Sequence, residues 1–405
     1  MQTSISQNFL THPHIREAES ILRTCVHCGF CTATCPTYQL LGDELDGPRG
    51  RIYLIKQVLE GKETSRRTQS HLDRCLTCRS CETTCPSGVR YGRLSEIGRE
   101  IVEQQVPRNL LQRVIRKLLR TILPYPGRFA FFYKTGLFFR PLLPASIKRK
   151  LPLPRLSSAA RLDTQTRKML VLQGCVQSVV TPQTNQAATR ILQKLGIELI
   201  AASKAGCCGA VSHHLSATEE GLDFMRHNID AWWPYIKQGA EAIVITASGC
   251  GSVVKEYAEL LSHDRVYADK ARRVSQLAKD ISEILSAENL ADFTKERSPG
   301  KVAFHSPCTL QHGQKITGVV EKILINAGFT LTQVEDAHLC CGSAGTYSIL
   351  QPGLSQQLLE NKLSALQKEH PELIVTANIG CQMHMASKSP LPVKHWLELI
   401  DEKLL

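Results

Sequence analysis

The sequence predicts a multidomain chain of the α+β and α/β classes, in which a helical cysteine-rich unit precedes two duplicated, small parallel-sheet domains. Three observations predict this arrangement. Two short cysteine runs repeat each other 50 residues apart, a second cysteine pattern repeats after about 130 residues, and strand and helix signals alternate through the second half. Such internal repeats mark units of structure. We expect domain boundaries at residues 1–104, 105–165, 166–300 and 301–405.

The first unit contains eight cysteines in two runs of the form C-x2-C-x2-C-x3-C-P, CVHCGFCTATCP and CLTCRSCETTCP. Three thiolates at this spacing ligate one [4Fe–4S] cluster, and the fourth cysteine, which precedes a proline, ligates the other cluster. The spacing predicts a two-cluster ferredoxin-like domain with crossed ligand sets: Cys25, Cys28, Cys31 and Cys85 for the first cluster, and Cys75, Cys78, Cys81 and Cys35 for the second. The alternatives are zinc, which normally uses two separate CxxC pairs, and unliganded structural cysteines.

The stretch between the two runs contains a turn followed by a helix. Gly47-Pro48-Arg49-Gly50 has the composition of a turn, and the pattern after it predicts a helix over residues 51–59. The guanidinium groups of Arg49 and Arg51 could lie near an anionic cluster and raise its reduction potential. The alternative is that both are ordinary surface charges.

Residues 105–165 differ in composition from the rest of the chain. No Asp or Glu occurs from Gln104 to Leu162, and five of the 11 phenylalanines lie here. This stretch holds 13 basic residues, enough to account for the net charge of +12: Arg108, Arg113, Arg116, Lys117, Arg120, Arg128, Lys134, Arg140, Lys148, Arg149, Lys150, Arg155 and Arg161. Basic and bulky apolar side chains together suit an anionic membrane surface. A segment packed on the other domains and a dock for an acidic partner are the alternatives, and no recognition motif supports nucleic acid.

Residues 166–405 carry the same order of strands and helices twice. Strands are expected at 168–174, 197–202 and 241–248, and again at 301–306, 329–334 and 373–378, with helices between them. The segment 268–290 is expected to form an extra helix and a connector between the halves. This alternation predicts two parallel-sheet domains, in which ligands bind at the carboxyl ends of the strands.

Each half carries the pattern C-x31-C-C-G followed by one more cysteine about 40 residues later. The first set is Cys175, Cys207, Cys208 and Cys250, and the second is Cys308, Cys340, Cys341 and Cys381. Four thiolates can hold a further cluster or a zinc ion, whereas the alternative is a duplicated set of inert buried cysteines. The pattern by itself assigns no residue a catalytic role.

The second half is chemically richer than the first. His305, His312, His338 and His384 stand where the first half has Leu172, Val179, Ala205 and Val253. We therefore take the second set, together with His384, as the candidate redox site.

The N-terminal 20 residues contain no apolar core of signal-peptide length, and no run of about 18 apolar residues occurs in the chain. We expect a cytoplasmic protein without a transmembrane helix, whose 16 cysteines stay reduced.

The two C-x2-C-x2-C-x3-C-P runs and the two Cys-Cys-Gly repeats resemble a group of respiratory iron–sulfur proteins. The group includes subunits of glycolate oxidase, anaerobic glycerol-3-phosphate dehydrogenase, lactate-oxidising complexes and heterodisulfide reductase. The strings NIDAWWP, TASGCG, CTLQHGQK, LCCGSAGTY and VTANIGCQ look most similar to the iron–sulfur subunits of glycolate oxidase. The likeness covers nearly the whole chain and is weakest over 105–165. Heterodisulfide reductase relatives end the pattern in C-x-x-C, where this chain has Val253 and His384, so their double cluster is not carried over.

The resemblance implies an electron-transfer subunit of an oxidoreductase complex that converts glycolate to glyoxylate. It implies FAD on partner subunits, electrons passed toward the quinone pool, and peripheral attachment to the cytoplasmic face of the inner membrane. The chain itself shows no G-x-G-x-x-G fingerprint between a strand and a helix, which agrees with a flavin held elsewhere. The alternatives are the equivalent subunit of a D-lactate or anaerobic glycerol-3-phosphate dehydrogenase, and a heterodisulfide-reductase-like catalyst at the Cys-Cys-Gly site.

Overall fold

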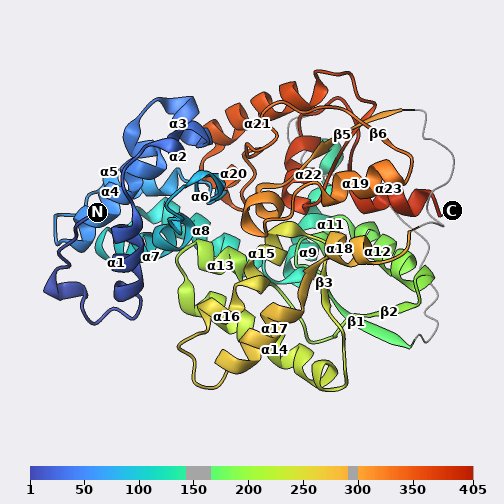
Figure 1. Ribbon diagram of the computed structural model, residues 1–405, viewed down its shortest axis with the longest axis horizontal. Helices are drawn as coiled ribbons and strands as arrows, with labels where there is room; N and C mark the ends of the chain where they lie inside the picture. The colour runs from blue at the N-terminus through green and yellow to red at the C-terminus, as the bar shows by residue number, and fades with distance from the viewer. Residues whose placement is uncertain (143–165, 291–299, 405) are drawn as a thin grey trace. The chain divides into compact units, whose positions relative to one another are not determined.

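The computed structural model describes residues 1–142, 166–290 and 300–404, and the chain divides into two compact units (Figure 1). Unit 1 comprises Met1–Lys117, His214–Ser216 and His338–Lys362. Unit 2 comprises Leu118–His213, Ala217–Ala337 and Leu363–Leu405. The last five basic residues of the expected connector, Lys148 to Arg161, lie outside the described residues.

Unit 1 is helical, and its N-terminal helices run from blue to cyan in Figure 1. They are α1 (Ile15–Thr24), α2 (Phe30–Ala33), α3 (Pro36–Leu41), α4 (Pro48–Leu59), α5 (Arg66–Asp73), α6 (Ser80–Thr84) and α7 (Tyr91–Gln105). Pro36 and Pro48 occupy the first turns of α3 and α4, where the missing N–H costs nothing. Ser65 caps α5 by accepting a hydrogen bond from the Thr68 N–H. The expected helix over residues 51–59 lies within α4.

The core of unit 1 is formed by apolar faces of α1, α4, α5 and α7. Leu22, Ile55, Leu72 and Leu94 are all at most 1% exposed within one cluster of buried side chains. Each cysteine run begins where a core helix has just ended, since Cys25 follows α1 and Cys75 follows α5. Each run then continues into one short helix, α2 or α6. The two cysteine loops are therefore anchored to the same packed scaffold.

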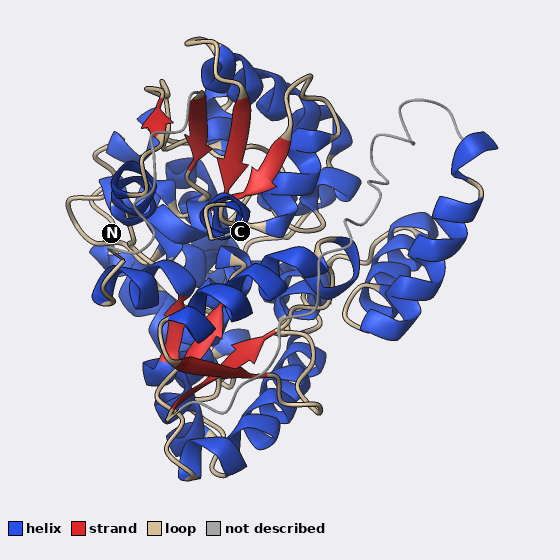
Figure 2. Cartoon of the chain, turned by 90° about the vertical axis from the view of Figure 1, so that its right-hand side faces the viewer, coloured by secondary structure: helices blue, strands red, loops and turns tan. Residues whose placement is uncertain are grey.

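Unit 2 contains two four-stranded parallel sheets, drawn in red in Figure 2. The first has the order β2-β1-β3-β4, and the second has the order β6-β5-β7-β8. Their bounds are β1 (Arg167–Leu172), β2 (Ile197–Ile200), β3 (Ile243–Ile245), β4 (Ala278–Asp280), β5 (Lys301–His305), β6 (Thr330–Leu331), β7 (Leu373–Thr376) and β8 (Val393–His395). The register pairs Leu170 with Ile243 in the first sheet and Val302 with Leu373 in the second. The expected duplicated parallel-sheet fold is confirmed.

The fourth strand of each sheet was not expected from the sequence. The segment 268–290, expected to be a helix and a connector, contains α17 (Ala268–Leu277), β4 and α18 (Ile281–Ala287). Asp280 caps α18 in a capping box with Glu283, so the strand passes directly into the helix.

The remaining α-helices of the described residues are α8 (Leu110–Ile122), α9 (Pro126–Phe138), α11 (Gln177–Val180), α12 (Pro182–Lys194), α13 (Ala210–His214), α14 (Thr218–Lys237), α15 (Ser248–Lys255), α16 (Tyr257–Leu260), α19 (Val319–Asn326), α20 (Tyr347–Leu350), α21 (Pro352–Gln367), α22 (Ile379–Ala386) and α23 (Trp396–Glu402).

Alternate residues of the first sheet face two different cores. Val171 and Val244 belong to a cluster that also contains Val375 and Trp396 of the second half. Leu170 and Leu172 of β1, with Ile243 and Ile245 of β3, belong to a second cluster that includes three cysteines of the first half and has Cys250 packed against it. The period of two along a strand produces this division. The two duplicated halves therefore share one hydrophobic core within unit 2.

Candidate metal centres

The eight cysteines of the two N-terminal runs line two cavities. Cys25, Cys28, Cys31 and Cys85 line the first, and Cys35, Cys75 and Cys78 line the second, while Cys81 lines both. Burial, followed by the charges of Cys25, Cys28 and Cys85, raises the pKa of Cys31 to about 11. Burial and the charges of Cys78, Cys75 and Cys35 likewise raise the pKa of Cys81. Thiols gathered in this way repel one another as thiolates unless a cation neutralises them, which is what an iron–sulfur core does.

Each cysteine loop uses the same unusual backbone conformation. In the first loop His27 and Gly29 have φ of 56° and 86°, and in the second Thr77 and Arg79 have φ of 53° and 60°. A β-branched threonine in the left-handed region is rare, so the fold must hold it there. Alternation of right- and left-handed residues turns successive N–H groups toward a common point and creates an anion-binding concavity. The Thr77 N–H already contacts the Cys75 sulfur at 3.4 Å.

The two cavities differ in exposure. Cys28 is exposed, and its neighbour Val26 is 67% exposed. At the corresponding positions of the second loop, Cys78 is half-buried and Leu76 is 7% exposed. The first cavity is therefore open to solvent at its cysteine loop, whereas the corresponding loop of the second is covered.

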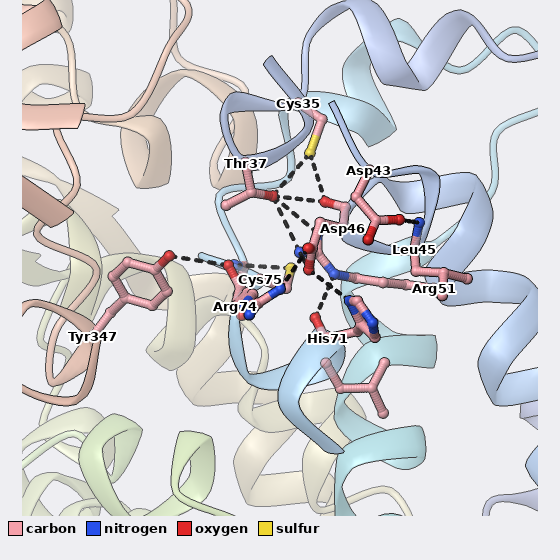
Figure 3. Close-up of polar contacts among 12 residues, drawn as sticks. Cys35, Thr37, Asp43, Leu45, Asp46, Arg51, His71, Arg74, Cys75 and Tyr347 are labelled. Atoms are coloured by element: carbon pink, nitrogen blue, oxygen red, sulfur yellow. Dashed lines mark hydrogen bonds and ion pairs between the residues drawn. The ribbon is translucent and has the colours of Figure 1, made fainter. Parts of the chain in front are cut away.

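The second cavity is lined by a buried arginine from α4. Arg51 Nε donates to the His71 carbonyl at 2.7 Å, and both terminal nitrogens of Arg51 lie 3.1 Å from Thr37 Oγ1 (Figure 3). Thr37 Oγ1 is 3.3 Å from the Cys35 sulfur and 2.8 Å from the Asp46 carbonyl oxygen. Burial raises the pKa of Cys75, but the guanidinium groups of Arg51 and Arg99 outweigh it, so the pKa lies below its usual value. The second cavity thus carries fixed positive charge.

Asp46 is the buried carboxylate that organises this arginine. Its Oδ1 accepts from His71 at 3.0 Å and lies 3.5 Å from Arg51, and its Oδ2 accepts from Arg74 at 2.7 Å (Figure 3). Ligand atoms of Asp43, Asp46 and His71 lie within 4.8 Å of one another, as in a metal site. Two guanidinium groups already neutralise Asp46, however, and they would repel a cation. We interpret this cluster as the support of Arg51 and not as a metal site.

Tyr347 also contacts the second cysteine loop from a distant part of unit 1. Its hydroxyl donates to the carbonyl of Arg74, the residue before Cys75, at 3.1 Å (Figure 3). Burial first, and then the charges of Cys75 and Cys340, raise the pKa of Tyr347, so this hydroxyl stays protonated. Thr37, Asp46, His71 and Tyr347 were not identified from the sequence, because no motif links positions so far apart.

The first Cys-Cys-Gly set is gathered within unit 2. Cys175 follows β1, Cys207 and Cys208 follow β2, and Cys250 lies on α15 after β3, all at the carboxyl ends of strands. Hydrogen bonds to Cys175 and Cys208, followed by burial, raise the pKa of Cys207, and a hydrogen bond to Cys208 raises the pKa of Cys250. The four thiols therefore form one connected group. Their number and mutual contact fit a tetrahedral metal or a cluster.

Neighbouring polar groups hold the Cys-Cys-Gly corner of the first half. The Asn228 side chain donates to the Cys207 carbonyl at 2.7 Å and accepts from the Gly206 N–H at 2.8 Å. The Tyr257 hydroxyl donates to the Cys208 carbonyl at 2.9 Å. The glycine that ends the corner has φ of 90° at Gly209, and its counterpart Gly342 has φ of 85°. A β-carbon at either glycine would come within 2.6 Å of a carbonyl oxygen, so both corners require glycine.

The second Cys-Cys-Gly set is divided between the units. Cys308 and Cys381 belong to unit 2, at the carboxyl ends of β5 and β7, and Cys340 and Cys341 belong to unit 1. Within unit 2, a ring nitrogen of His305 and the Cys381 sulfur lie within 4.8 Å of each other. His312 and His384 are buried, and His338, in unit 1, is half-buried. The redox role of Cys308, Cys340, Cys341, Cys381 and His384 stays a prediction.

In its described part, residues 105–142, the basic segment contains α8 and α9, and its charged groups differ in their surroundings. Arg108 pairs with Asp73 at 2.7 Å and with Glu103 at 2.7 Å, so it is part of unit 1. In unit 2, α9 buries Tyr133 against Val180 and Ile379. Four phenylalanines of the α9 region remain 48% to 78% exposed: Phe131, Phe132, Phe138 and Phe139. None of the helices in the described residues has the length and apolar composition to cross a membrane.

Comparison with protein families matches the regions that carry these sites. Residues 21–89 match the 4Fe-4S dicluster domain, and residues 169–255 and 302–386 match the cysteine-rich domain. The glycolate oxidase iron–sulfur subunit of Escherichia coli strain K12 is 56% identical over 405 residues, covering 100% of this chain and 99% of that protein. This chain belongs to the family of glycolate oxidase iron–sulfur subunits. The eight cysteines of its dicluster domain are the number that two [4Fe–4S] clusters require.

Two further relatives extend this family assignment. A probable glycolate oxidase iron–sulfur subunit of Bacillus subtilis strain 168 is 31% identical over 401 residues, covering 91% of this chain and 89% of that protein. A crystal structure of a hypothetical protein from Helicobacter pylori matches with a TM-score of 0.58 and 11% identity, covering 97% of this chain and 72% of that chain. The latter likeness concerns the fold alone. The predicted family resemblance is confirmed.

Proposed function

We propose that this chain is the electron-transfer subunit of a glycolate-oxidising complex, and that it carries electrons from a flavin-bearing partner subunit toward the respiratory chain. The observation that supports this most directly is the pair of cysteine-lined cavities in one helical unit. Bound [4Fe–4S] clusters would supply one-electron steps, which suit a partner flavin that yields electrons in pairs. Oxidation of glycolate to glyoxylate is then the task of the partner subunit.

The ligand sets that we propose are crossed between the two runs. Cys25, Cys28, Cys31 and Cys85 would hold the first cluster, and Cys35, Cys75, Cys78 and Cys81 the second. The lining of the two cavities supports this division for every cysteine except Cys81, which lines both. The cysteine charges that raise the pKa of Cys31 and of Cys81 support it too, since all of them come from the proposed partners in the same set. This chain's role is to supply the thiolates, to aim the N–H groups of the left-handed residues at the bound sulfides, and to exclude water from the second site.

For the first Cys-Cys-Gly set we propose a bound metal, either zinc or a further iron–sulfur cluster. The connected thiols of Cys175, Cys207, Cys208 and Cys250 support a metal over inert packing, because neutral thiols are weak hydrogen-bond donors and acceptors and gain little from meeting one another. Metal analysis of the full chain tests this proposal. Iron near eight atoms per chain with one zinc would favour zinc, iron well above eight would favour a further cluster, and iron near eight without zinc would contradict both.

The exposed face of α9 is the surface that we propose meets the membrane. Arg128 and Lys134 are exposed among the four phenylalanines, which is the composition of a helix lying in an anionic lipid interface. Electrons would then leave toward the quinone pool at the cytoplasmic face. Flotation of the full chain with anionic and with neutral vesicles tests this surface. Binding to the anionic vesicles alone is expected, and binding to neither kind would contradict the proposal and favour a protein partner instead.

The deciding experiment is anaerobic purification of the chain with its native partners, followed by addition of glycolate. Bleaching of the visible cluster absorbance, with flavin in the preparation, is the expected result. Bleaching by D-lactate or glycerol 3-phosphate but not by glycolate would instead assign the chain to a related complex that oxidises that substrate. If dithionite bleaches the clusters and none of these substrates does, the substrate assignment is wrong and the disulfide-reductase alternative must be tested.

A further inference from the structure

Arg51 is a deeply buried cation in the wall of the second cavity. Its side chain is 1% exposed, the lowest value among the arginines and lysines of the described residues. It lines the same cavity as Cys35, Cys75, Cys78 and Cys81. Burial acts to lower the pKa of Arg51, but the acidic groups around it, Cys75 first among them, more than offset this effect, so the guanidinium group stays protonated. The second cavity therefore contains a permanent positive charge.

Hydrogen bonds to three acceptors hold the Arg51 guanidinium group in place. The His71 carbonyl, the Thr37 hydroxyl and the Asp46 carboxylate accept from its nitrogens (Figure 3). Thr37 extends the contact to the cysteines, since its hydroxyl lies 3.3 Å from the Cys35 sulfur. Because both terminal nitrogens of Arg51 point at the lone pairs of that hydroxyl, its one hydrogen is left for the Asp46 carbonyl or for Cys35. The arginine thus acts on the sulfur directly by charge and through a polarised hydroxyl.

The neighbouring carboxylate does not cancel this charge. Asp46 is shared between Arg51 and Arg74, and it approaches Arg74 more closely, at 2.7 Å, than Arg51, at 3.5 Å. Arg99 also donates to the Cys75 carbonyl at 2.6 Å, so three guanidinium groups lie around this cavity, and they exceed the carboxylates of Asp46 and the adjacent Asp43 by one unit of charge. A net positive charge in a buried wall acts on its neighbours with little screening by solvent.

The same helix presents a contrasting arginine to the first cavity. Arg49 lies two positions before Arg51 on α4, and residues two apart on a helix face different directions. It lines the first cavity, but its side chain is 35% exposed and forms two hydrogen bonds with Glu44, at 3.1 and 2.6 Å. Its charge is therefore both paired and screened. Helix α4 therefore gives the two cysteine cavities different electrostatic environments.

We propose that Arg51, held by Asp46, Thr37 and His71, is the residue that raises the reduction potential of the second cluster, so that this cluster is selectively poised to accept electrons. The proposal rests on the ligand set given above for that cluster. Reduction adds one electron and one negative charge without making or breaking a bond, and Arg51 keeps its proton throughout. The electron comes from a flavin-bearing partner in the complex, or from dithionite in a titration. Arg51 is a positioning charge and not a ligand.

The test is a redox titration of the full chain, followed by electron paramagnetic resonance, in Arg51→Gln, Arg51→Lys and Asp46→Asn. Arg51→Gln is expected to lower the reduction equilibrium constant of one cluster at least tenfold, which is about 59 mV for one electron. Asp46→Asn removes a negative charge and is expected to shift the same cluster in the opposite direction. Arg51→Lys is expected to retain more than half of the wild-type effect. If Arg51→Gln and Asp46→Asn shift the reduction potential in opposite directions, the cause is charge. Structural damage would shift the potential in the same direction in both variants.

The cluster that responds is identified with Cys28→Ala, which removes a proposed ligand of the first cluster and leaves the signal of the second. Shifts confined to that remaining signal support the proposal. Unchanged potentials in Arg51→Gln, with both clusters loaded, would overturn it and leave the electron-transfer function intact. Absence of two clusters in the wild-type chain would instead overturn the ligand sets. If Arg51→Gln does not load, Asp46→Asn still decides the matter, because a shift to lower potential or none contradicts the proposal.

Discussion

The two cysteine cavities of unit 1 have the same motif and the same loop conformation, yet they differ in exposure and in the pairing of the nearby arginine. The first has an exposed cysteine, Cys28, an exposed Val26, and an arginine at the surface. At the same positions the second has the half-buried Cys78 and the buried Leu76, and its arginine is 1% exposed. Spacing determines which sulfurs can meet one core, whereas burial and fixed charge set its potential. A duplicated motif therefore yields two electron carriers that need not be equal.

The difference has a functional consequence for the proposed electron path. An exposed cluster exchanges electrons readily with another protein, because the distance to the partner is short. A covered cluster with a positive charge in its wall can hold an electron away from solvent and from adventitious oxidants. We therefore expect the first site to contact the partner flavoprotein and the second to receive the electron within the chain.

The largest expected effects come from removing one cysteine from each site. Cys28→Ala and Cys75→Ala are each expected to lose about four iron atoms, because each removes a proposed ligand of a different cluster. Cys75→Ala also leaves a cavity beside Arg51, so we expect its melting temperature to lie about 4 °C below that of Cys28→Ala, which corresponds to roughly 1 kcal/mol in a domain of this size. Iron analysis and circular dichroism measure the two effects.

Full retention of iron in Cys75→Ala would contradict the proposed second ligand set. The control is Ser262→Ala, at an exposed position of unit 2 that lies far along the sequence from either cysteine run. That variant should keep both the iron content and the melting temperature. Equal melting temperatures for the two cysteine variants would remove the distinction between an exposed and a covered site.

The loop conformation is the next feature that distinguishes the sites. The first loop uses Gly29 at φ of 86°, where the second has Arg79 at φ of 60°. Gly29→Val places a β-branched residue in the left-handed region, which costs about 1–2 kcal/mol, and its β-carbon would lie 3.1 Å from Arg49 Nη1. We expect the first cluster alone to release iron to a chelator about tenfold faster, since about 1.4 kcal/mol is a factor of ten.

Gly127→Ala is the matched control for that substitution, because a β-carbon there meets no atom within 4 Å and its φ is not positive. It should leave the release rate of both clusters unchanged. If Gly29→Val accelerated the release of both clusters equally, the two loops would not be independent, and the comparison between them would fail.

The sequence predicted the cysteine scaffold better than its surroundings, for physical reasons. The first three strands of each half are apolar runs, and they were found where β1, β2, β3, β5, β6 and β7 lie. The fourth strands, with sequences AKD and VKH, are three residues long and carry charged side chains, so they have no hydrophobic pattern to reveal them. Their place in the sheet comes from pairing with β3 and β7.

The environment of the second site could not be predicted, because it joins positions that are distant in the chain. Thr37, Asp46, Arg51 and His71 converge only after α3, α4 and α5 have packed. The sequence placed Arg49 and Arg51 together as candidates for charges near a cluster. It could not separate them, since the direction of each side chain depends on where α4 begins and on what covers it.

A smaller effect is expected from the hydroxyl that lies between Arg51 and Cys35. Thr37→Val keeps the shape of the side chain but removes the atom 3.3 Å from the Cys35 sulfur. We expect the second potential to fall by less than in Arg51→Gln, because the guanidinium charge remains. Ser87, which follows Cys85 and Pro86 as Thr37 follows Cys35 and Pro36, lines the first cavity and provides the control. If Ser87→Ala shifted the potential of the first cluster as much as Thr37→Val shifts that of the second, the contact between Thr37 and Arg51 would not be the cause of the shift.

The smallest effect, and the sharpest test of the comparison, concerns the exposed arginine. Arg49→Gln leaves Glu44 unpaired at the surface, and we expect the potential of the first cluster to change only slightly at low salt. Raising the ionic strength from about 0.01 to 1 M shortens the screening length from about 30 to 3 Å, so this shift should vanish. The shift caused by Arg51→Gln should persist at both salt concentrations, because solvent ions do not reach a side chain that is 1% exposed. If the two arginine variants responded to salt alike, burial would not be what separates the two sites, and the second cluster would owe its potential to something other than Arg51.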